Sequence, residues 1–172
     1  MNLGRGMMTK GLLALTPAAL SLKTFASFDD AMRKVEARSS GTAGEMKALR
    51  DQAKELGRTT SFTATQIGEL QAKLAQKGFN RAQLRKMTPA VQDLARAAGE
   101  GGEEDTTLAA DLVSGTLRAF QLDANESGRV ADVMAAAVNN SSFKLQALID
   151  SMKYAGPVAS QFGLGLEETV AL

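Results

Sequence analysis

The sequence predicts an all-α protein, an array of about eight short-to-medium helices joined by stapled corners, with an extended N-terminal helix. Three observations predict this class. Apolar residues recur at helical spacing along most of the 172 residues, and no stretch has the alternating pattern of a half-buried strand. Helix-start motifs recur at several corners. Aromatic residues make up only 5% of the chain, and Ala, Leu and Met dominate its apolar residues, which suits close helix packing.

One corner combines three local signals. Thr63 and Gln66 have the spacing of a capping box, in which each side chain bonds the other residue's backbone N–H. Phe62 and Ile67 flank this cap at the spacing of a hydrophobic staple. Gly57 is expected to end the preceding helix in the left-handed conformation that glycine adopts readily. A helix, a stapled corner and a second helix are therefore predicted here.

The same device recurs further along the chain. Phe79 and Asn80 precede Gln83 at the same spacing, directly after Gly78. Residues 122–126 repeat the pattern in part. We expect both corners to anchor successive helices against one core.

The N-terminal region divides into a glycine-containing lead, residues 1–10, and an apolar stretch, residues 11–22. The stretch is shorter than the ~20 residues that span a bilayer, and no small-x-small cleavage site follows it, so a signal peptide and membrane contact are both disfavoured. Pro17 is interpreted as the first residue of a helix capped by Thr16 that runs to about Arg38. The expected division is residues 1–38, the lead and extended helix, and 39–172, a helical core region.

This first helix carries a narrow apolar seam at 3-4-3 spacing, formed by Phe25, Phe28, Met32 and Val35. A narrow seam covers one neighbour, so we expect self-association through this helix. The alternatives are that the helix folds back onto the core region as an ordinary core helix, or that it meets a different protein.

Further helices are expected at about 44–56, 64–77, 81–87, 89–98, 106–120 and 124–138, with another capped by Ser142. Thr88 and Pro89 are expected to separate the third and fourth of these. A bend at 154–157 should precede a short piece, 158–162, that Gly163 ends. Residues 165–168 look like the first turn of a last helix, and because the chain ends soon afterwards we expect it to be a fragment of a longer protein.

The composition leaves few routes to catalysis or metal binding. The chain has no Cys and no His, which excludes disulfides, thiol chemistry and the commonest transition-metal ligand. The acidic loop 99–105 lacks the calcium-loop spacing, and acids there are explained by the helix dipole. Ser151 and Lys153 would point to different faces of a helix, and Glu126 before Ser127 is explained by capping. The sequence therefore predicts no enzyme, no cofactor and no metal.

Charge is distributed unevenly. Residues 1–99 carry 16 Lys/Arg against 8 Asp/Glu, a balance of +8, and residues 100–172 carry 4 against 11, a balance of −7. The two halves could attract each other, or each could face a different partner. Arg81, Arg85 and Lys86 cluster without aromatic stacking residues, so no sequence-specific nucleic-acid binding is predicted.

Several segments, taken together and in order, resemble the core region of phage tail tape measure proteins. The likeness spans about residues 25–172 and includes an LG-x-TT-x-F corner at 56–62, an LA-x-x-GF corner at 74–79 and a KYA-x-PVA bend at 153–159. Further matching segments are LRAF at 117–120, VADVM at 130–134 and GLGLEE at 163–168. Gly165 departs from the serine cap that is commoner in the family, although glycine also serves as a cap.

The resemblance implies a structural component of a tailed phage, a prophage, a tailocin or a gene transfer agent. A tape measure lies inside the tail tube, sets tail length, nucleates tube assembly at the tip and leaves before DNA passes. The implied partners are itself, in three or six copies, the tail tube, the tail tip or baseplate hub, and tail assembly chaperones. The implied location is the tail lumen or tip, after synthesis in the host cytoplasm. The alternative is the helical part of an effector or wall-degrading enzyme that the particle delivers.

Overall fold

The computed structural model describes the backbone of residues 17–99, 101–141 and 144–171, and side chains from residue 25 onward. Within these ranges the chain forms eight α-helices, one 3-10 turn and no strand, which confirms the all-α prediction. The helices are α1 (Pro17–Arg38), α2 (Ala43–Thr59), α3 (Ala64–Gln76), α4 (Arg81–Ala98), α5 (Glu103–Ala119), α6 (Ser127–Asn139), α7 (Leu145–Gln161) and α8 (Leu166–Ala171).

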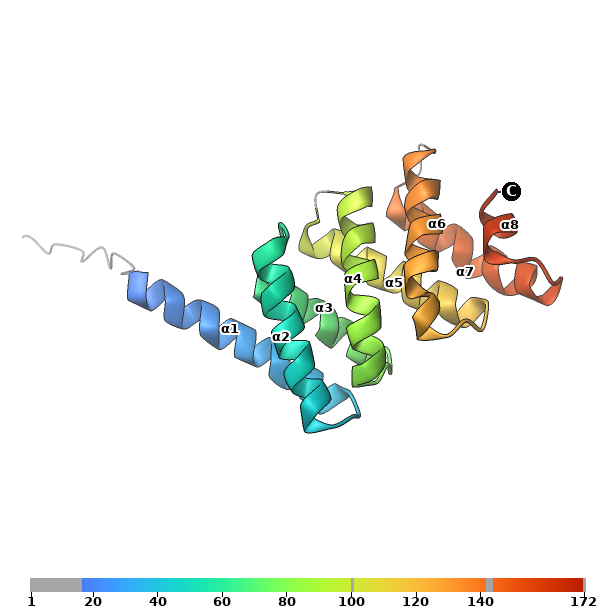
Figure 1. Ribbon diagram of the computed structural model, residues 1–172. Helices are drawn as coiled ribbons and strands as arrows, with labels where there is room; N and C mark the ends of the chain where they lie inside the picture. Colours follow the sequence, from blue (N-terminus) through green and yellow to red (C-terminus); the bar gives the residue numbers. More distant parts are fainter. Residues whose placement is uncertain (1–16, 100, 142–143, 172) are drawn as a thin grey trace, which may run out of the picture.

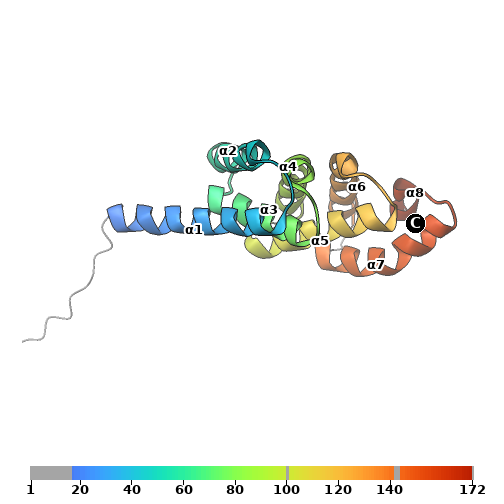
Figure 2. The same ribbon diagram turned by 90° about the horizontal axis from the view of Figure 1, so that it is seen from below.

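The helices form an elongated array of two layers (Figures 1 and 2). Helices α2, α4 and α6 lie in one layer, and α1, α3, α5 and α7 lie in the other. Within a layer each helix packs on the next one, α1 on α3, α3 on α5 and α5 on α7, while α2 packs on α4 and α4 on α6. Successive helices of the chain pack across the layers from α2 to α6. This nearest-neighbour stacking is the arrangement of an α-solenoid.

Helix α3 lies at the centre of the first half of the array and contacts α1, α2, α4 and α5. It is therefore buried on several sides, including the predicted Ile67, Leu70 and Leu74. Gly68 lies under α1, where a methyl group would be 3.1 Å from the Ala31 side chain. The absence of a side chain at Gly68 thus permits the close contact between α1 and α3.

The apolar faces predicted for the other helices point into the same core. Met46, Leu49 and Ala53 of α2 are buried, as are Val130 and Met134 of α6. The apolar face of α5 is buried along most of the helix, through Ala109, Leu112, Val113, Thr116 and Leu117. Phe120, just after the helix ends, packs against the same core.

The prediction that Gly57 ends a helix is wrong. Helix α2 continues through Gly57 to Thr59, and Thr60 then adopts an extended conformation. A methyl group on Gly57 would lie 2.4 Å from the backbone nitrogen of Ala64, at the start of α3. Glycine is needed here for close approach of two helices, and not for a left-handed turn. Gly78 and Gly163 do have the left-handed conformation, with φ of +90° and +77°.

The predicted break at Thr88–Pro89 does not occur, because α4 is continuous from Arg81 to Ala98. Proline has no N–H to donate to the carbonyl four residues earlier, which here belongs to Arg85. The side chain of Gln52 on α2 donates to that carbonyl at 2.8 Å. A neighbouring helix therefore supplies the hydrogen bond that Pro89 removes.

The predicted break at 154–157 is also wrong, since α7 runs without interruption through Pro157 to Gln161. Pro157 and Lys153 are exposed, so solvent can reach the carbonyl that loses its helical donor. The N-cap of α7 is Lys144, which supplies no side-chain hydrogen bond, and the predicted cap Ser142 lies outside the described residues.

Two other helix starts differ from the prediction. Helix α5 begins at Glu103, so the acidic residues form its first turn, where they interact favourably with the helix dipole. Asp123 caps a 3-10 turn (Ala124–Glu126) by accepting from the Asn125 N–H at 2.8 Å, and α6 follows from Ser127. The predicted lead, residues 1–10, the apolar residues 11–16 and the Thr16 cap lie outside the described residues.

Candidate interaction surface

The polar corner residues singled out in the sequence form caps at helix starts. Thr63 accepts from the Gln66 N–H at 3.2 Å, and the Gln66 side chain accepts from the Thr63 N–H at 2.7 Å. Asn80 and Gln83 form the same reciprocal pair, each at 2.9 Å. The oxygen or backbone N–H of each of these four residues takes part in a cap at a helix start, which is a structural role.

A third capping box was missed in the sequence analysis. Thr42 accepts from the Glu45 N–H at 3.2 Å, and the Glu45 carboxylate accepts from the Thr42 N–H at 2.7 Å. The backbone hydrogen bond holds the pKa of Glu45 below its usual range. The T-x-x-E spacing could have predicted it, but no cap was assigned to the helix expected from residue 44.

The two staple phenylalanines differ in burial. Phe62 is 3% exposed, and Ile67 is fully buried in the same core. The Phe62 ring lies against Gly101, where a methyl group would be 2.9 Å from its Cζ atom, so this corner also fixes the loop before α5. Phe79 is only half-buried, and the Arg118 guanidinium lies 5.7 Å from its ring centroid.

The seam on α1 is used partly inside the molecule. Met32 and Val35 are fully buried, and Phe28 packs against the same core, with Met32 and Phe28 both close to Gly68 of α3. The C-terminal half of the seam therefore packs on the core region, as expected if the first helix folds back onto it. Phe25, by contrast, is 72% exposed.

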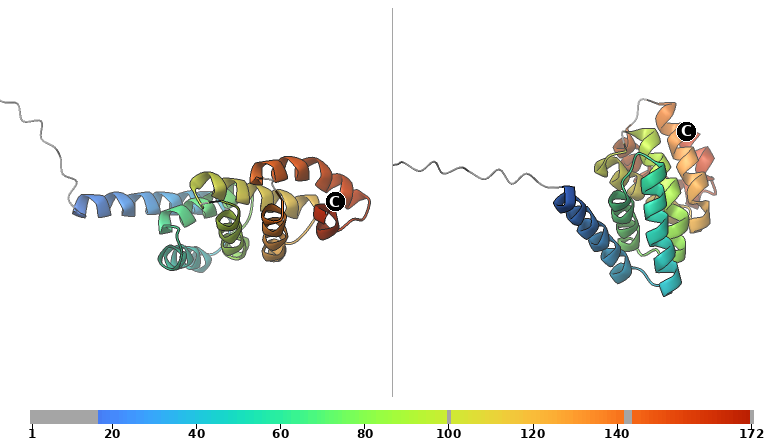
Figure 3. Two further views of the ribbon diagram at one scale, coloured as in Figure 1. Left: turned by 90° about the horizontal axis from the view of Figure 1, so that it is seen from above. Right: turned by 60° about the vertical axis from the view of Figure 1, so that its left-hand side comes forward.

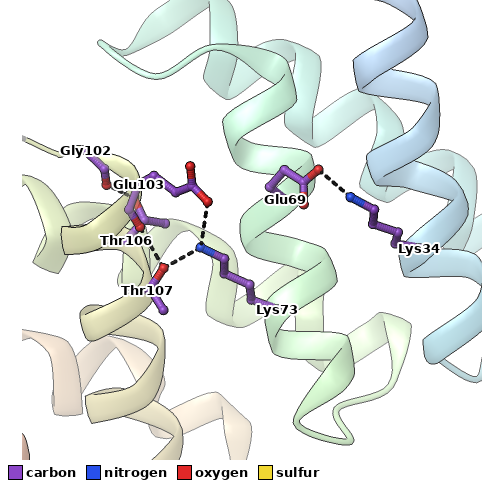
Figure 4. Close-up of polar contacts among 7 residues, drawn as sticks. All are labelled: Lys34, Glu69, Lys73, Gly102, Glu103, Thr106 and Thr107. Atoms are coloured by element: carbon purple, nitrogen blue, oxygen red, sulfur yellow. Dashed lines mark hydrogen bonds and ion pairs between the residues drawn. The ribbon is translucent and has the colours of Figure 1, made fainter.

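Polar contacts link α3 to the helices on both sides of it in its layer (Figure 4). Lys34 of α1 pairs with Glu69 of α3 at 3.0 Å. Lys73 of α3 points the other way, toward α5, where it contacts the Thr107 hydroxyl and lies 3.7 Å from the Glu103 carboxylate. These pairs fix the helices laterally within the layer.

Some of the uneven charge is neutralised inside the chain. Lys73 and Lys77 of the basic half pair with Glu103 and Asp111 of the acidic half, across the boundary between α3 and α5. This is the attraction between halves that was one of the two interpretations of the charge distribution.

The residue pairs considered for catalysis are not brought together. The Ser151 hydroxyl donates to the Ala147 carbonyl at 2.9 Å, while the Lys153 amine lies 5.8 Å from the centroid of the Tyr154 ring. Glu126 pairs with Arg129 at 2.8 Å. Among the described residues no three His, Cys, Asp or Glu side chains are grouped as a metal site would require. Nor is any helix in the described part both long and apolar enough to cross a membrane.

The feature that the sequence analysis missed is an apolar groove at the C-terminal end of the array. It has a volume of about 860 Å³ and lies between α6, α7 and α8. Tyr154, Val158 and Phe162, spaced four residues apart along one side of α7 and into the corner that follows it, are exposed, and Val158 and Phe162 line this groove. Their spacing was visible in the sequence, but the expected bend at 154–157 separated Tyr154 from Val158 and Phe162.

Comparison with known proteins gives matches over most of the chain. Residues 50–172 match the family described as phage-related minor tail protein. The chain is 36% identical over 171 residues to the tape measure protein of Pneumococcus phage Dp-1, covering 99% of this chain and 14% of that protein. It is 29% identical over 169 residues to the probable tape measure protein of Escherichia phage P2, covering 98% of this chain and 20% of that protein. No solved structure matches.

Proposed function

The chain belongs to the phage-related minor tail protein family, and from this membership we propose that it is a structural section of a tape measure protein in the tail of a phage or phage-like particle. The observation that carries the proposal is the 36% identity to a named tape measure protein over 99% of this chain. The chain spans 14% and 20% of the length of the two relatives. We therefore propose the determination of tail length and the nucleation of the tail tube as functions of a whole tape measure protein that contains such a section.

The architecture supports a structural role. Each helix packs mainly on its nearest neighbours, so the described helices form an elongated body (Figure 1). The residues that hold its corners are used for capping and core packing. Such a body can present long lateral faces to other proteins.

The finer elements of the proposal follow from the resemblance. We place the section in the tail lumen or at the tip, in contact with tail tube and tip or baseplate hub proteins, after folding with tail assembly chaperones in the host cytoplasm. It leaves before DNA passes. Self-association in three or six copies belongs to this proposal. The fully buried Met32 and Val35 limit any contact between copies through the α1 seam to its N-terminal half.

The test is an in-frame deletion of residues 43–139 in the particle that encodes the chain. We expect tails to be absent or altered in length in electron micrographs. An Ala82→Asp variant is the control, because residue 82 is exposed and an acid near a helix N-terminus is tolerated. Normal numbers of tails with normal length in the deletion would contradict a tape measure role.

A second measurement tests the alternative that the chain is part of a wall-degrading enzyme. The purified chain is incubated with peptidoglycan, with a lysozyme reaction as the positive control. We expect no release of soluble fragments, because the proposed role needs no reaction. Release at a rate proportional to protein concentration would favour a wall-degrading function instead.

A further inference from the structure

Gly115 of α5 is an exposed glycine in the interior of a helix, where glycine is less favourable than alanine. Three other glycines in helix interiors allow a close approach within the chain. Gly57 lies close to the start of α3, Gly68 lies under α1, and a methyl group on Gly156 would be 3.2 Å from a side chain of α5. A methyl group on Gly115 would meet no atom within 4 Å. No contact within the described chain therefore accounts for glycine at this position.

Gly115 lines a furrow between α5 and α7, which lie side by side in the array (Figure 3). This α5–α7 furrow has a volume of about 600 Å³. Val113 and Leu117 are buried in the core, and residues two positions apart on a helix point to nearly opposite sides, so Gly115 faces away from the core. Both walls are helices that pack on each other, so the furrow is formed between two neighbours within the array.

The α5–α7 furrow combines an apolar surface with a basic rim. The apolar residues of its lining come from both helices: Leu112, Ala119, Ile149, Met152 and Pro157. Arg118 of α5 and Lys153 of α7 are exposed cations. Asp111, the acidic residue of the lining, is paired with Lys77 of α3. The cations at the rim therefore exceed the anions, and a partner that docks here should carry carboxylates at its edges.

Arg118 is held in place before a partner binds. Its guanidinium donates to the Lys77 carbonyl and lies 5.7 Å from the centroid of the Phe79 ring. A guanidinium has five N–H donors, so further donors remain for a carboxylate. A side chain that is already ordered loses less conformational entropy when a partner binds, which favours Arg118 as an anchor.

We propose that the α5–α7 furrow is the docking site for an acidic amphipathic helix of another protein. Apolar residues along one side of that helix would pack on Ile149 and Pro157, and its carboxylates would meet Arg118 and Lys153 on opposite walls. Gly115 would be the point of closest approach, because glycine lets the backbone of a second helix come near. The phosphates of a nucleic acid would meet the same cations but would leave the apolar lining uncovered. This inference goes beyond the proposed function and does not rest on it.

The first test compares two probe peptides of about 18 residues, roughly 27 Å as a helix, each with leucine and alanine along one face. One peptide carries glutamate on both flanks and the other carries lysine. In fluorescence anisotropy titrations with the full chain at low salt, we expect the glutamate peptide to bind more tightly by about tenfold or more. Lys153→Glu should reduce this preference, by weakening binding of the glutamate peptide and strengthening binding of the lysine peptide. Equal binding of both peptides by the wild type, or stronger binding of a single-stranded oligonucleotide, would overturn the proposal.

The second test fills the furrow. Gly115→Leu should weaken binding of the glutamate peptide by about tenfold or more, because the leucine side chain occupies the point of closest approach. The unfolding midpoint in denaturant should be retained or raised, since a Cβ at this position meets no atom within 4 Å. Gly128→Leu is the matched control and should bind the peptide like the wild type. Gly128 on α6 is exposed, also has no atom within 4 Å of an added methyl group, and does not line this furrow.

Two results of the second test contradict the proposal directly: a folded Gly115→Leu variant that binds the glutamate peptide like the wild type, and a wild type that binds neither peptide. Wild-type dimers that Gly115→Leu dissociates would overturn it in favour of a second copy as the occupant. None of these readouts depends on tail assembly, so their failure would leave the proposed function standing, with the deletion of residues 43–139 as its own test.

Discussion

Close backbone contacts set the strictest requirements on individual residues, and Gly57 is the clearest example. It lies inside α2, where an added methyl group would be 2.4 Å from the nitrogen and 2.7 Å from the Cα atom of Ala64. Those are backbone atoms, so they cannot rotate away. Gly57→Ala is expected to lower the free energy of unfolding by about 1–3 kcal/mol, as overpacking does, measured by denaturant unfolding.

The control is Gly115→Ala on α5. Gly115 is exposed, and an added methyl group would meet no atom within 4 Å. The same substitution should raise the free energy of unfolding there by about 0.5–1 kcal/mol, through helix propensity. Equal effects at the two positions would contradict the close approach of α2 and α3.

Burial distinguishes the two staple phenylalanines. Phe62 is 3% exposed and packs on Gly101, so Phe62→Ala should cost about 3–5 kcal/mol of unfolding free energy. Phe79 is half-buried, and Phe79→Ala should cost less than about half as much, because part of its ring already contacts water. Unchanged denaturant midpoints for both variants would show that neither corner contributes to the core.

At the scale of elements, α4 shows how a neighbouring helix can preserve a helix through a proline. The Gln52 side chain of α2 donates to the Arg85 carbonyl that Pro89 leaves without a partner. Gln52→Ala should therefore cost about 1 kcal/mol of unfolding free energy.

A double-mutant cycle with Pro89→Ala tests this explanation. The alanine introduced by that substitution can donate its own N–H to the Arg85 carbonyl, so Gln52→Ala should cost about 0.5–1 kcal/mol less in that background. The measurement is denaturant unfolding of the wild type, both single variants and the double variant. The same cost in both backgrounds would mean that Gln52 acts independently of the proline.

Across the whole molecule, the free energy of local unfolding of each helix should rise with the number of helices that pack on it. Helix α3 packs on α1, α2, α4 and α5, whereas α8 packs only on α6 and α7 among the substantial contacts of the described chain. Native-state hydrogen exchange should be slowest in α3 and more than about tenfold faster in α8 and in residues 17–27 of α1. Uniform protection along the chain would indicate a single cooperative unit and contradict this gradient.

The sequence by itself determined the helical class, the capped corners and the inward faces. These depend on contacts between residues three or four positions apart, such as Thr63 with Gln66, so a short window contains all the information. The tail family was predicted separately, from the resemblance of short segments to known proteins of that family in the same order and at similar spacing. Composition was enough to exclude Cys and His chemistry.

Only the tertiary structure decided whether a local signal was overruled. Gly57 and Pro89 each suggested a helix end. Gly57 instead allows α3 to approach α2 closely, and the hydrogen bond that Pro89 removes is replaced by one from Gln52 of another helix. The seam of α1 was visible as a pattern, yet its division into a buried half at Met32 and an exposed half at Phe25 depends on where α3 begins. The groove between α6, α7 and α8 likewise exists only once three helices are placed together. Such features come from contacts between residues far apart in the chain, which no periodicity encodes.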